Sequence, residues 1–316
     1  MKYVSTGVLV ALILSLAPYT VYAQLNGHNI RGDVGVGSGT QPPPGTYAGF
    51  VVLNYDTDTL KNRDGEKFNT TGKIGVNAVA PLIAWVGPKK VLGGHYGFTV
   101  VLPPVQNNAL TAPVFGLDSD TGHGIGDMYL QPLSLGWTTP RADYIVGVGF
   151  FLPTGRYAVD ADDNIGFGMT SFELSAGTTA YLDTAKTLRA SATAYWETHS
   201  QKKDSDTTVG DLLTIEGGLG KSFLKGAASV GLAYAAQWKV TADDFGSRVP
   251  NRVAEFSQHR VFGLGPDITL PIATKKKLIA FLNVRALWEA GAHSTTQGRM
   301  LVVTTTFPVP SISLTK

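Results

Sequence analysis

Three short runs contain histidine, serine or glycine in arrangements that could support catalysis or cofactor binding. His199 and Ser200 could be the base and the nucleophile of a lipid-modifying enzyme, but adjacent residues of a strand point to opposite faces and do not easily make that contact. The run 220–222 (GKS) resembles the end of a phosphate-binding loop, but Ile215 stands where that loop needs glycine. The glycines of 35–39 follow no strand and open no helix, so they do not indicate a dinucleotide site. We therefore expect no catalytic residues and no enzyme activity.

A metal site is suggested only by Asp160, Asp162 and Asn164, which match the start of a calcium-binding loop. The match fails further on, because Ile165 and Ser171 occupy the sixth and twelfth positions, which need glycine and glutamate. Loose cation binding remains an alternative to a solvated acidic loop. The 316 residues include no cysteine, which excludes a thiolate zinc site, a cysteine nucleophile and a disulfide scaffold. We expect neither a metal site nor a cofactor.

Charged residues recur on one parity of several strand-like runs and form the candidate site. A charge that faces lipid costs roughly 2–4 kcal/mol at the middle of a bilayer, so we expect these side chains to face the lumen of a barrel. They either fill the lumen and hold it together by pairing with one another, or line a polar path or a polar wall around a solute. The lumen-facing candidates are Glu173, Arg189, Glu197, Glu216, Lys239, Asp267, Arg285 and Glu289.

Alternation of apolar and polar residues predicts the strands that position these charges. In 227–240, large apolar side chains share one parity, while small or polar side chains share the other. No helical period of comparable length occurs. We expect about twelve strands, near 46–57, 72–86, 91–103, 126–138, 142–153, 168–182, 187–198, 210–223, 226–240, 258–272, 277–290 and 298–307.

The length of these runs and of their connections favours a transmembrane barrel over a soluble sandwich. Soluble strands average about five or six residues, whereas these runs have the length of tilted strands that cross a bilayer. Tyr and Trp gather near the run ends, where the aromatic girdles of a barrel lie. Short and long connections alternate, as periplasmic turns and extracellular loops do. The predicted fold is all-β: a transmembrane antiparallel up-and-down β-barrel of about 12 strands, spanning 46–308.

The two ends of the chain differ from the barrel in composition. Residues 1–23 combine Lys2, a short apolar run and a small-residue cleavage site, which predicts a cleaved signal peptide and export to the bacterial outer membrane. Residues 24–45 are rich in Gly and Pro and form a candidate plug. Residues 309–316 form a short C-terminal tail. The net charge of +2 and the lack of a basic run argue against nucleic acid as a partner.

Several stretches together resemble the outer-membrane family labelled for the meta-pathway of phenol degradation. They cover most of 40–308: PPPGTYAG (42–49), LGGHYGF (92–98), GIGDMYLQPLSLGW (124–137), FLPTGRY (151–157), FELSAG (172–177), ATAYWETHSQKKDSD (192–206), GDLLTIEGGLGKSF (210–223), VGLAYAAQWKVT (230–241), GLGPDITLPI (263–272) and VRALWEAGAHSTTQG (284–298). The resemblance implies a transporter barrel and offers no catalytic residues. The last aromatic residue, Phe307, is not terminal, unlike the usual barrel assembly signal.

The expected function is a channel or facilitator for the uptake of small hydrophobic or aromatic compounds, as the resemblance implies. One alternative is a structural or surface-interaction barrel with a filled lumen; another is an outer-membrane lipid-modifying enzyme. The expected partners are outer-membrane lipid and lipopolysaccharide, the barrel assembly machinery and a small hydrophobic or aromatic solute.

Overall fold

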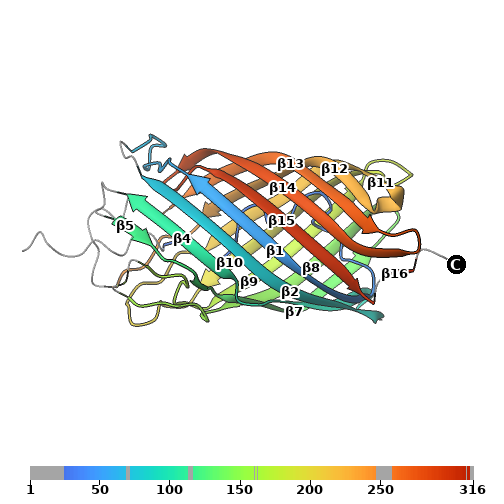
Figure 1. Cartoon of the computed structure of the whole chain (residues 1–316), viewed down its shortest axis with the longest axis horizontal. Coiled ribbons are helices and arrows are strands. Elements are labelled where there is room, and N and C mark those ends of the chain that lie inside the picture. The colour runs from blue at the N-terminus through green and yellow to red at the C-terminus, as the bar shows by residue number, and fades with distance from the viewer. Residues whose placement is uncertain are drawn as a thin grey trace, which may run out of the picture.

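Twelve antiparallel strands close into a single barrel in the computed structural model (Figure 1). The structure describes residues 25–68, 72–112, 117–159, 161, 163–246, 258–310 and 312–313, so the predicted signal peptide lies outside the described residues. Each barrel strand pairs with its neighbours along the chain, and β1 closes the barrel by pairing with both β2 and β15. The predicted fold class is therefore confirmed. Among the described residues, no helix has the length and apolar character to cross a membrane.

The barrel strands lie close to the predicted runs. Their bounds are β1 (Gly45–Thr57), β2 (Lys73–Val91), β3 (Gly94–Val101), β7 (Met128–Thr138), β8 (Ala142–Leu152), β9 (Ser171–Tyr181), β10 (Leu188–His199), β11 (Leu212–Phe223), β12 (Ala228–Lys239), β13 (Arg260–Ala273), β14 (Lys277–His293) and β15 (Arg299–Val309). Three short strands, β4 (Val105–Ala112), β5 (Leu117–Asp120) and β6 (Gly124–Ile125), lie outside the closed circuit.

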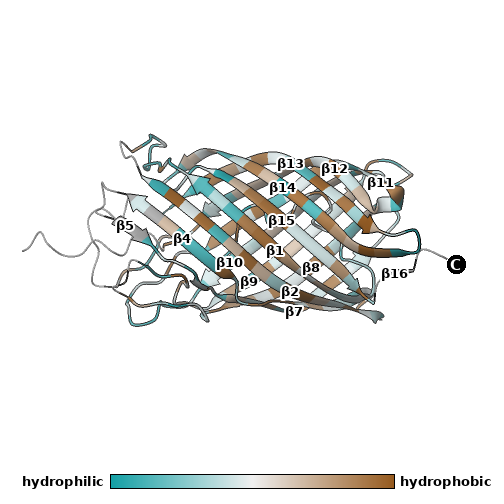
Figure 2. Ribbon diagram, viewed as in Figure 1, coloured by the Kyte–Doolittle hydropathy of each residue, from teal (hydrophilic) through white to brown (hydrophobic). Residues whose placement is uncertain are grey.

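Large apolar side chains cover the outer surface of the barrel. Leu219, Leu232 and Trp288 are 53%, 53% and 58% exposed, although they lie in the middle or near the ends of regular strands. Figure 2 shows brown apolar bands along most strands of the barrel wall. Exposed apolar surface on this scale is unfavourable in water and favourable in lipid. The strands therefore place their apolar parity outward, as the sequence predicted.

The strand β2 is longer than predicted and changes partner along its length. Its first half pairs with β4 and its second half with β3, and the change falls at Pro81, which cannot donate to a ladder. The predicted runs 72–86 and 91–103 imply a turn at 87–90, which is wrong, because these residues belong to β2 and the turn is Leu92–Gly93. Both turn residues have positive φ, the geometry that matches the twist of a two-residue hairpin.

The strand β7 contains a bulge that reverses the side-chain parity. Its register with β8 shifts between Leu130 and Leu133, around Pro132. Before the bulge Gln131 shares the inward parity, and after it Ser134 does. A bulge adds one residue to a strand, so the alternation changes face there. The period of this run could therefore not assign one inward parity to the whole strand.

The long connections and the C-terminus lie at opposite ends of the barrel. In Figure 1 the long connections are at the left, and the C-terminus is at the right with the short turns. The predicted C-terminal tail includes β16 (Ile312–Ser313), which pairs with the start of β14. We call the two ends the long-loop end and the short-turn end.

Candidate functional site: the barrel lumen

Residues 25–41 run through the lumen from one end of the barrel to the other. At the long-loop end, Lys239 donates a hydrogen bond to the carbonyl of Leu25, with an N–O distance of 2.6 Å. At the short-turn end, Gln41 donates to Ser134 over 3.1 Å. Between these points the lumen segment, as we call residues 25–41, makes hydrogen bonds to eight consecutive strands, β7 to β14. Only a position inside the barrel reaches all of these strands.

Three buried carboxylates hold the backbone of the lumen segment. Glu197 accepts the N–H groups of residues 28 and 29 over 2.8 and 3.0 Å. Glu216 accepts those of residues 32 and 34 over 2.7 and 2.9 Å, and Asp267 accepts that of residue 36 over 2.7 Å. Hydrogen bonds to a charged acceptor contribute more than neutral ones, about 1.5–3 kcal/mol each. The carboxylates thus provide an anchor for each part of the segment.

Ion pairs add a second set of contacts between the segment and the wall. Arg31 binds Glu289 over 2.7 Å, and Arg285 lies 3.6 Å from Asp267 while donating to the carbonyl of residue 32. Buried charges are stable only when they are paired and hydrogen-bonded. These residues therefore neutralise each other's charges and also hold the lumen segment in position.

The eight predicted lumen-facing residues all lie on the inward parity. Seven are buried, with exposed fractions of 9% or less: Glu173, Glu197, Glu216, Lys239, Asp267, Arg285 and Glu289. Arg189 is only half-buried, stands over the ring of Tyr181 and has a buried Nε without a hydrogen-bond partner. Sequence reasoning missed the residues of the lumen segment that pair with these charges, since no periodicity links a coil to a barrel wall.

The glycines of the lumen segment permit its close approach to the wall. A Cβ atom on Gly39 would overlap the backbone of Thr178, and one on Gly35 would overlap the carboxylate of Asp267. Backbone atoms of a strand cannot move away as a flexible side chain can. The run of glycines that fits no nucleotide-binding pattern is thus explained by packing.

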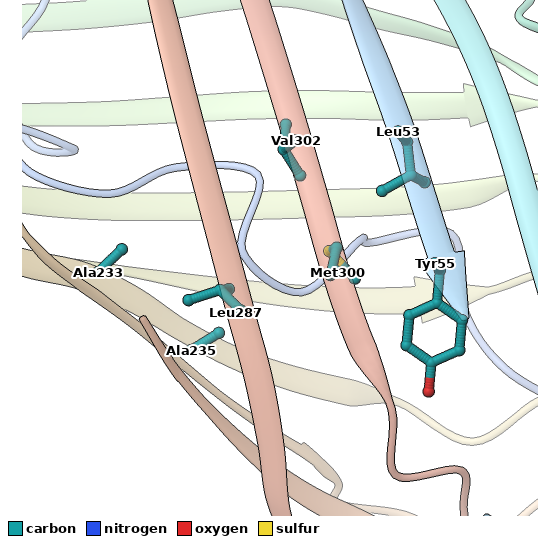
Figure 3. Packing of buried hydrophobic residues seen from close by; sticks show 7 residues of the cluster. All are labelled: Leu53, Tyr55, Ala233, Ala235, Leu287, Met300 and Val302. Carbon is teal, nitrogen blue, oxygen red and sulfur yellow. The ribbon is translucent and has the colours of Figure 1, made fainter. Parts of the chain in front are cut away.

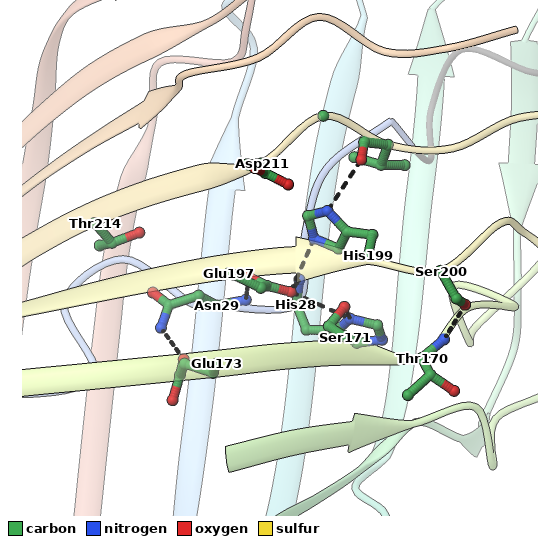
Figure 4. Close-up of polar contacts among 12 residues, drawn as sticks. His28, Asn29, Thr170, Ser171, Glu173, Glu197, His199, Ser200, Asp211 and Thr214 are labelled. Carbon is green, nitrogen blue, oxygen red and sulfur yellow. Dashed lines mark hydrogen bonds and ion pairs between the residues drawn. The ribbon is translucent and has the colours of Figure 1, made fainter. Parts of the chain in front are cut away.

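His28 lies at the centre of a polar cluster near the long-loop end (Figure 4). Its Nδ1 is 2.7 Å from the hydroxyl of Ser171, and its Nε2 is 3.1 Å from Asp127. These contacts have the order of a nucleophile, a base and an acid. Ser171 is 0% exposed, however, and the ring of His28 stacks on Phe151, so a substrate cannot reach the hydroxyl. The cluster anchors the segment instead.

His199 and Ser200 do not contact each other. The ring of His199 binds Glu197 and the carbonyl of Val209, whereas Ser200 binds the N–H of Thr170 on another side (Figure 4). The opposite orientation that the sequence predicted is therefore observed. Of the candidate calcium loop, Asp160 and Asp162 lie outside the described residues, and the described residues contain no group of three or more metal-ligating side chains.

Part of the inner face is apolar, on β1, β2 and β15 and on short stretches of β12 and β14. A buried cluster on these strands consists of Leu53, Tyr55, Ala233, Ala235, Leu287, Met300 and Val302, and Val51, Val76 and Ala78 pack against it (Figure 3). We call the part on β1, β2 and β15 the apolar wall. Sequence analysis predicted a polar lumen and missed this wall, because these strands carry apolar residues on both parities.

The first residue of the lumen segment lies in an apolar cluster at the long-loop end. Leu25 packs with Met169, Val209 and Phe245 in a buried apolar cluster. Beside this cluster, a cavity of about 310 Å³ opens between two of the long loops. It is lined by Pro153, Gly155, Tyr157, Gly168, Met169, Thr170, Ser200, Gln201 and Lys203.

An outward apolar surface, a closed antiparallel barrel and a polar interior define the class as an outer-membrane β-barrel. The chain belongs to the family named for the MetA-pathway of phenol degradation, whose model matches residues 57–304. The resemblance seen in the sequence is thereby confirmed. A comparison with curated protein sequences found no significant match.

Among solved structures, the chain is similar to the COG4313 outer membrane channel from Pseudomonas putida F1, with a TM-score of 0.72 and 14% identity. That match covers 87% of this chain and 99% of the other, and it supports the fold. The CymD monoaromatic hydrocarbon channel matches with a TM-score of 0.42 and 8% identity, covering 92% of this chain and 97% of that one. The Ralstonia pickettii toluene transporter TbuX matches with a TM-score of 0.39 and 12% identity, covering 84% of this chain and 90% of that one. Scores this low carry no argument.

Proposed function

We propose that the protein is an outer-membrane channel for the uptake of small hydrophobic or aromatic compounds. The observation that carries this proposal is the division of the lumen. The polar strands hold the lumen segment, while the apolar wall offers a surface on which an apolar solute replaces water favourably. A barrel with only a structural role has no need for such a wall.

The family of the chain agrees with this proposal. It is named for the degradation of phenol, which is itself a small aromatic compound. We further propose export by a signal peptide cleaved after Ala23, insertion by the barrel assembly machinery, and contact with lipid and lipopolysaccharide in the outer membrane. The proposal involves no cofactor and no nucleic acid.

Entry of a hydrophobic fluorescent probe into intact Gram-negative cells tests the function. The naphthylamine probe N-phenyl-1-naphthylamine fluoresces after it crosses the outer membrane. We expect faster entry into cells that produce the protein than into cells that produce an equal amount of a control outer-membrane barrel. Hydrolysis of a hydrophilic β-lactam in the periplasm should change far less. Equal probe entry in both strains would contradict the proposal.

A structural barrel is the second candidate, favoured by the buried ion pairs that fill part of the lumen. It predicts that replacing Arg285 lowers stability and leaves solute entry unchanged. The proposed channel predicts a change in both, because Arg285 also holds the lumen segment. A lipid-modifying enzyme would need Ser171, His28 or His199 to be accessible, and all three are buried. Lipid hydrolysis by the purified protein that is lost in Ser171→Ala would restore that alternative.

A further inference from the structure

The lumen segment is attached to one side of the barrel. Its hydrogen bonds and ion pairs to the barrel, over the described residues, end on β7 to β14 or on Asp127 just before β7. On the other side, Arg31 lies over the ring of Tyr55, 5.9 Å from its centroid, and Gly32 packs on Leu287 near Met300. These contacts of the segment with the apolar wall lie near the long-loop end.

From these contacts toward the short-turn end, the apolar wall continues and its side chains face the lumen without being buried. Val51 on β1 lies opposite Ala80 on β2 and Thr304 on β15, and all three share the inward parity of the buried residue Leu53. Leu82 continues the same row toward the short-turn end. These four residues are half-buried, although they face the interior: Val51, Ala80, Leu82 and Thr304. Side chains that point inward and remain accessible border open space within the barrel.

Two tyrosines of β1 stand at the ends of this row. The hydroxyl of Tyr55 donates to Glu289 over 2.8 Å at the long-loop end. The hydroxyl of Tyr47 donates to the carbonyl of Pro43 over 2.7 Å at the short-turn end. Both side chains are 7% exposed. The two tyrosines are eight positions apart along the strand, which spans about 26 Å at the usual rise of an extended chain.

We infer that small, uncharged, ring-sized solutes bind at the apolar wall between the two tyrosines, on the accessible side chains of Val51, Ala80 and Leu82, beside a lumen segment that stays in place. This inference rests on the proposed function and adds the location and the chemical class of the solute. The bordering side chains Val51, Ala80 and Leu82 offer apolar contact, and Ala80 is small enough to leave room for a ring.

The chemistry of this row selects against charged solutes. No Asp, Glu, Lys or Arg occurs on the inward parity of β1 between the two tyrosines, nor opposite it at the paired positions of β2. A charge that leaves water without a partner is strongly disfavoured. Thr304 and Thr306 on β15 add hydroxyl groups at the lumen face, so a ring that carries one hydroxyl also fits.

Cysteine protection tests the location, because the chain has no cysteine of its own. Ala80→Cys places a thiol beside Val51 on the apolar wall. Ser175→Cys places one at a half-buried inward position of β9, one of the strands that hold the lumen segment. The purified, full mature chain in detergent is treated with N-ethylmaleimide, with and without toluene. At about ten times its dissociation constant, toluene should slow labelling of Ala80→Cys about tenfold. Labelling of Ser175→Cys should not change, and benzoate should protect neither variant.

A second variant pair separates the inference from the proposed function. Ala80→Trp fills the wall, whereas Val79→Trp adds the same bulk on the lipid-facing side of the same strand. Heat-modifiable migration shows that each barrel has folded. Toluene entry into cells should fall several-fold with Ala80→Trp only. Normal entry with Ala80→Trp and no protection of Ala80→Cys would overturn the inference and leave the function standing. Absence of toluene entry with the unsubstituted protein would overturn both.

Discussion

Buried carboxylates bind backbone N–H groups of the lumen segment. Glu197, Glu216 and Asp267 accept five such hydrogen bonds between them. The inward direction of these residues could be predicted from the sequence, because charges recur on one parity of apolar strands. Their partners could not be predicted, since a backbone N–H carries no sequence signal.

Loss of the Glu216 carboxylate should loosen the middle of the lumen segment. Glu216→Ala removes the acceptor for two N–H groups and leaves them buried without a partner, at a cost of about 1–3 kcal/mol for each group. We expect faster hydrogen exchange at residues 32 and 34 in the folded barrel. The control Glu66→Ala changes an exposed loop residue. Unchanged exchange at both amides in Glu216→Ala would show that the carboxylate is not an anchor.

Lys202 should make the long-loop end sensitive to pH. Burial lowers the pKa of Lys202 to about 8, and its ammonium donates to the carbonyl of Phe167. The folded loop binds this proton less tightly than the unfolded loop does. Its stability should therefore rise as the pH increases from about 8 toward the ordinary lysine pKa, and be lowest below 8.

The measurement for Lys202 is hydrogen exchange of residues 200–211, corrected for the intrinsic effect of pH. Protection should increase between pH 8 and pH 10 in the unsubstituted protein. Lys202→Met cannot titrate and should lose this dependence. The same pH dependence in both proteins would assign it to another group.

The irregularities of β7 and β2 could not be predicted from the alternation of apolar and polar residues. In β7 the bulge at Pro132 moves the inward parity from Gln131 to Ser134, and in β2 the pairing passes from β4 to β3 at Pro81. Each proline removes a ladder donor, so the sequence marks the places correctly. It does not say whether the chain bulges or changes partner there, because the neighbouring strands decide this.

A side chain at Gly39 should displace residues 36–41, the part of the lumen segment at the short-turn end. Gly39→Ala would bring a Cβ into the backbone of Thr178, which the β-sheet holds in place. We expect faster exchange at residues 36–41 and a barrel that still folds. Gly75→Ala in β2 is the control, since its Cβ would make only an ordinary contact of 3.8 Å. Equal protection of the segment in both variants would argue against close packing at Gly39.

The whole molecule combines a barrel that its own strands close with a segment that occupies part of the lumen. The barrel class and its approximate strand bounds followed from alternation and run length alone. The path of residues 25–41 and the apolar wall did not, because both depend on which strands come together when the barrel closes. Those strands lie far apart in the sequence, and β1 and β15 meet only when the barrel closes.

Removal of residues 25–41 should open a wide aqueous path. The segment fills the polar side of the lumen, and the buried charges that it leaves would bind water. In planar bilayers we expect discrete conductance steps that are much larger for the shortened chain than for the full mature chain. Equal conductance of the two proteins would mean that the segment does not limit the aqueous path.

The central claim is that an apolar solute binds at the apolar wall while the lumen segment remains in place. The most direct measurement is a crystal structure of the full mature chain soaked in bromobenzene, with the bromine located by its anomalous scattering. We predict a bromine peak beside Val51 and Ala80, between β1, β2 and the unmoved segment. Bromine found only on the lipid-facing surface, or in a lumen from which the segment has been displaced, would contradict the claim.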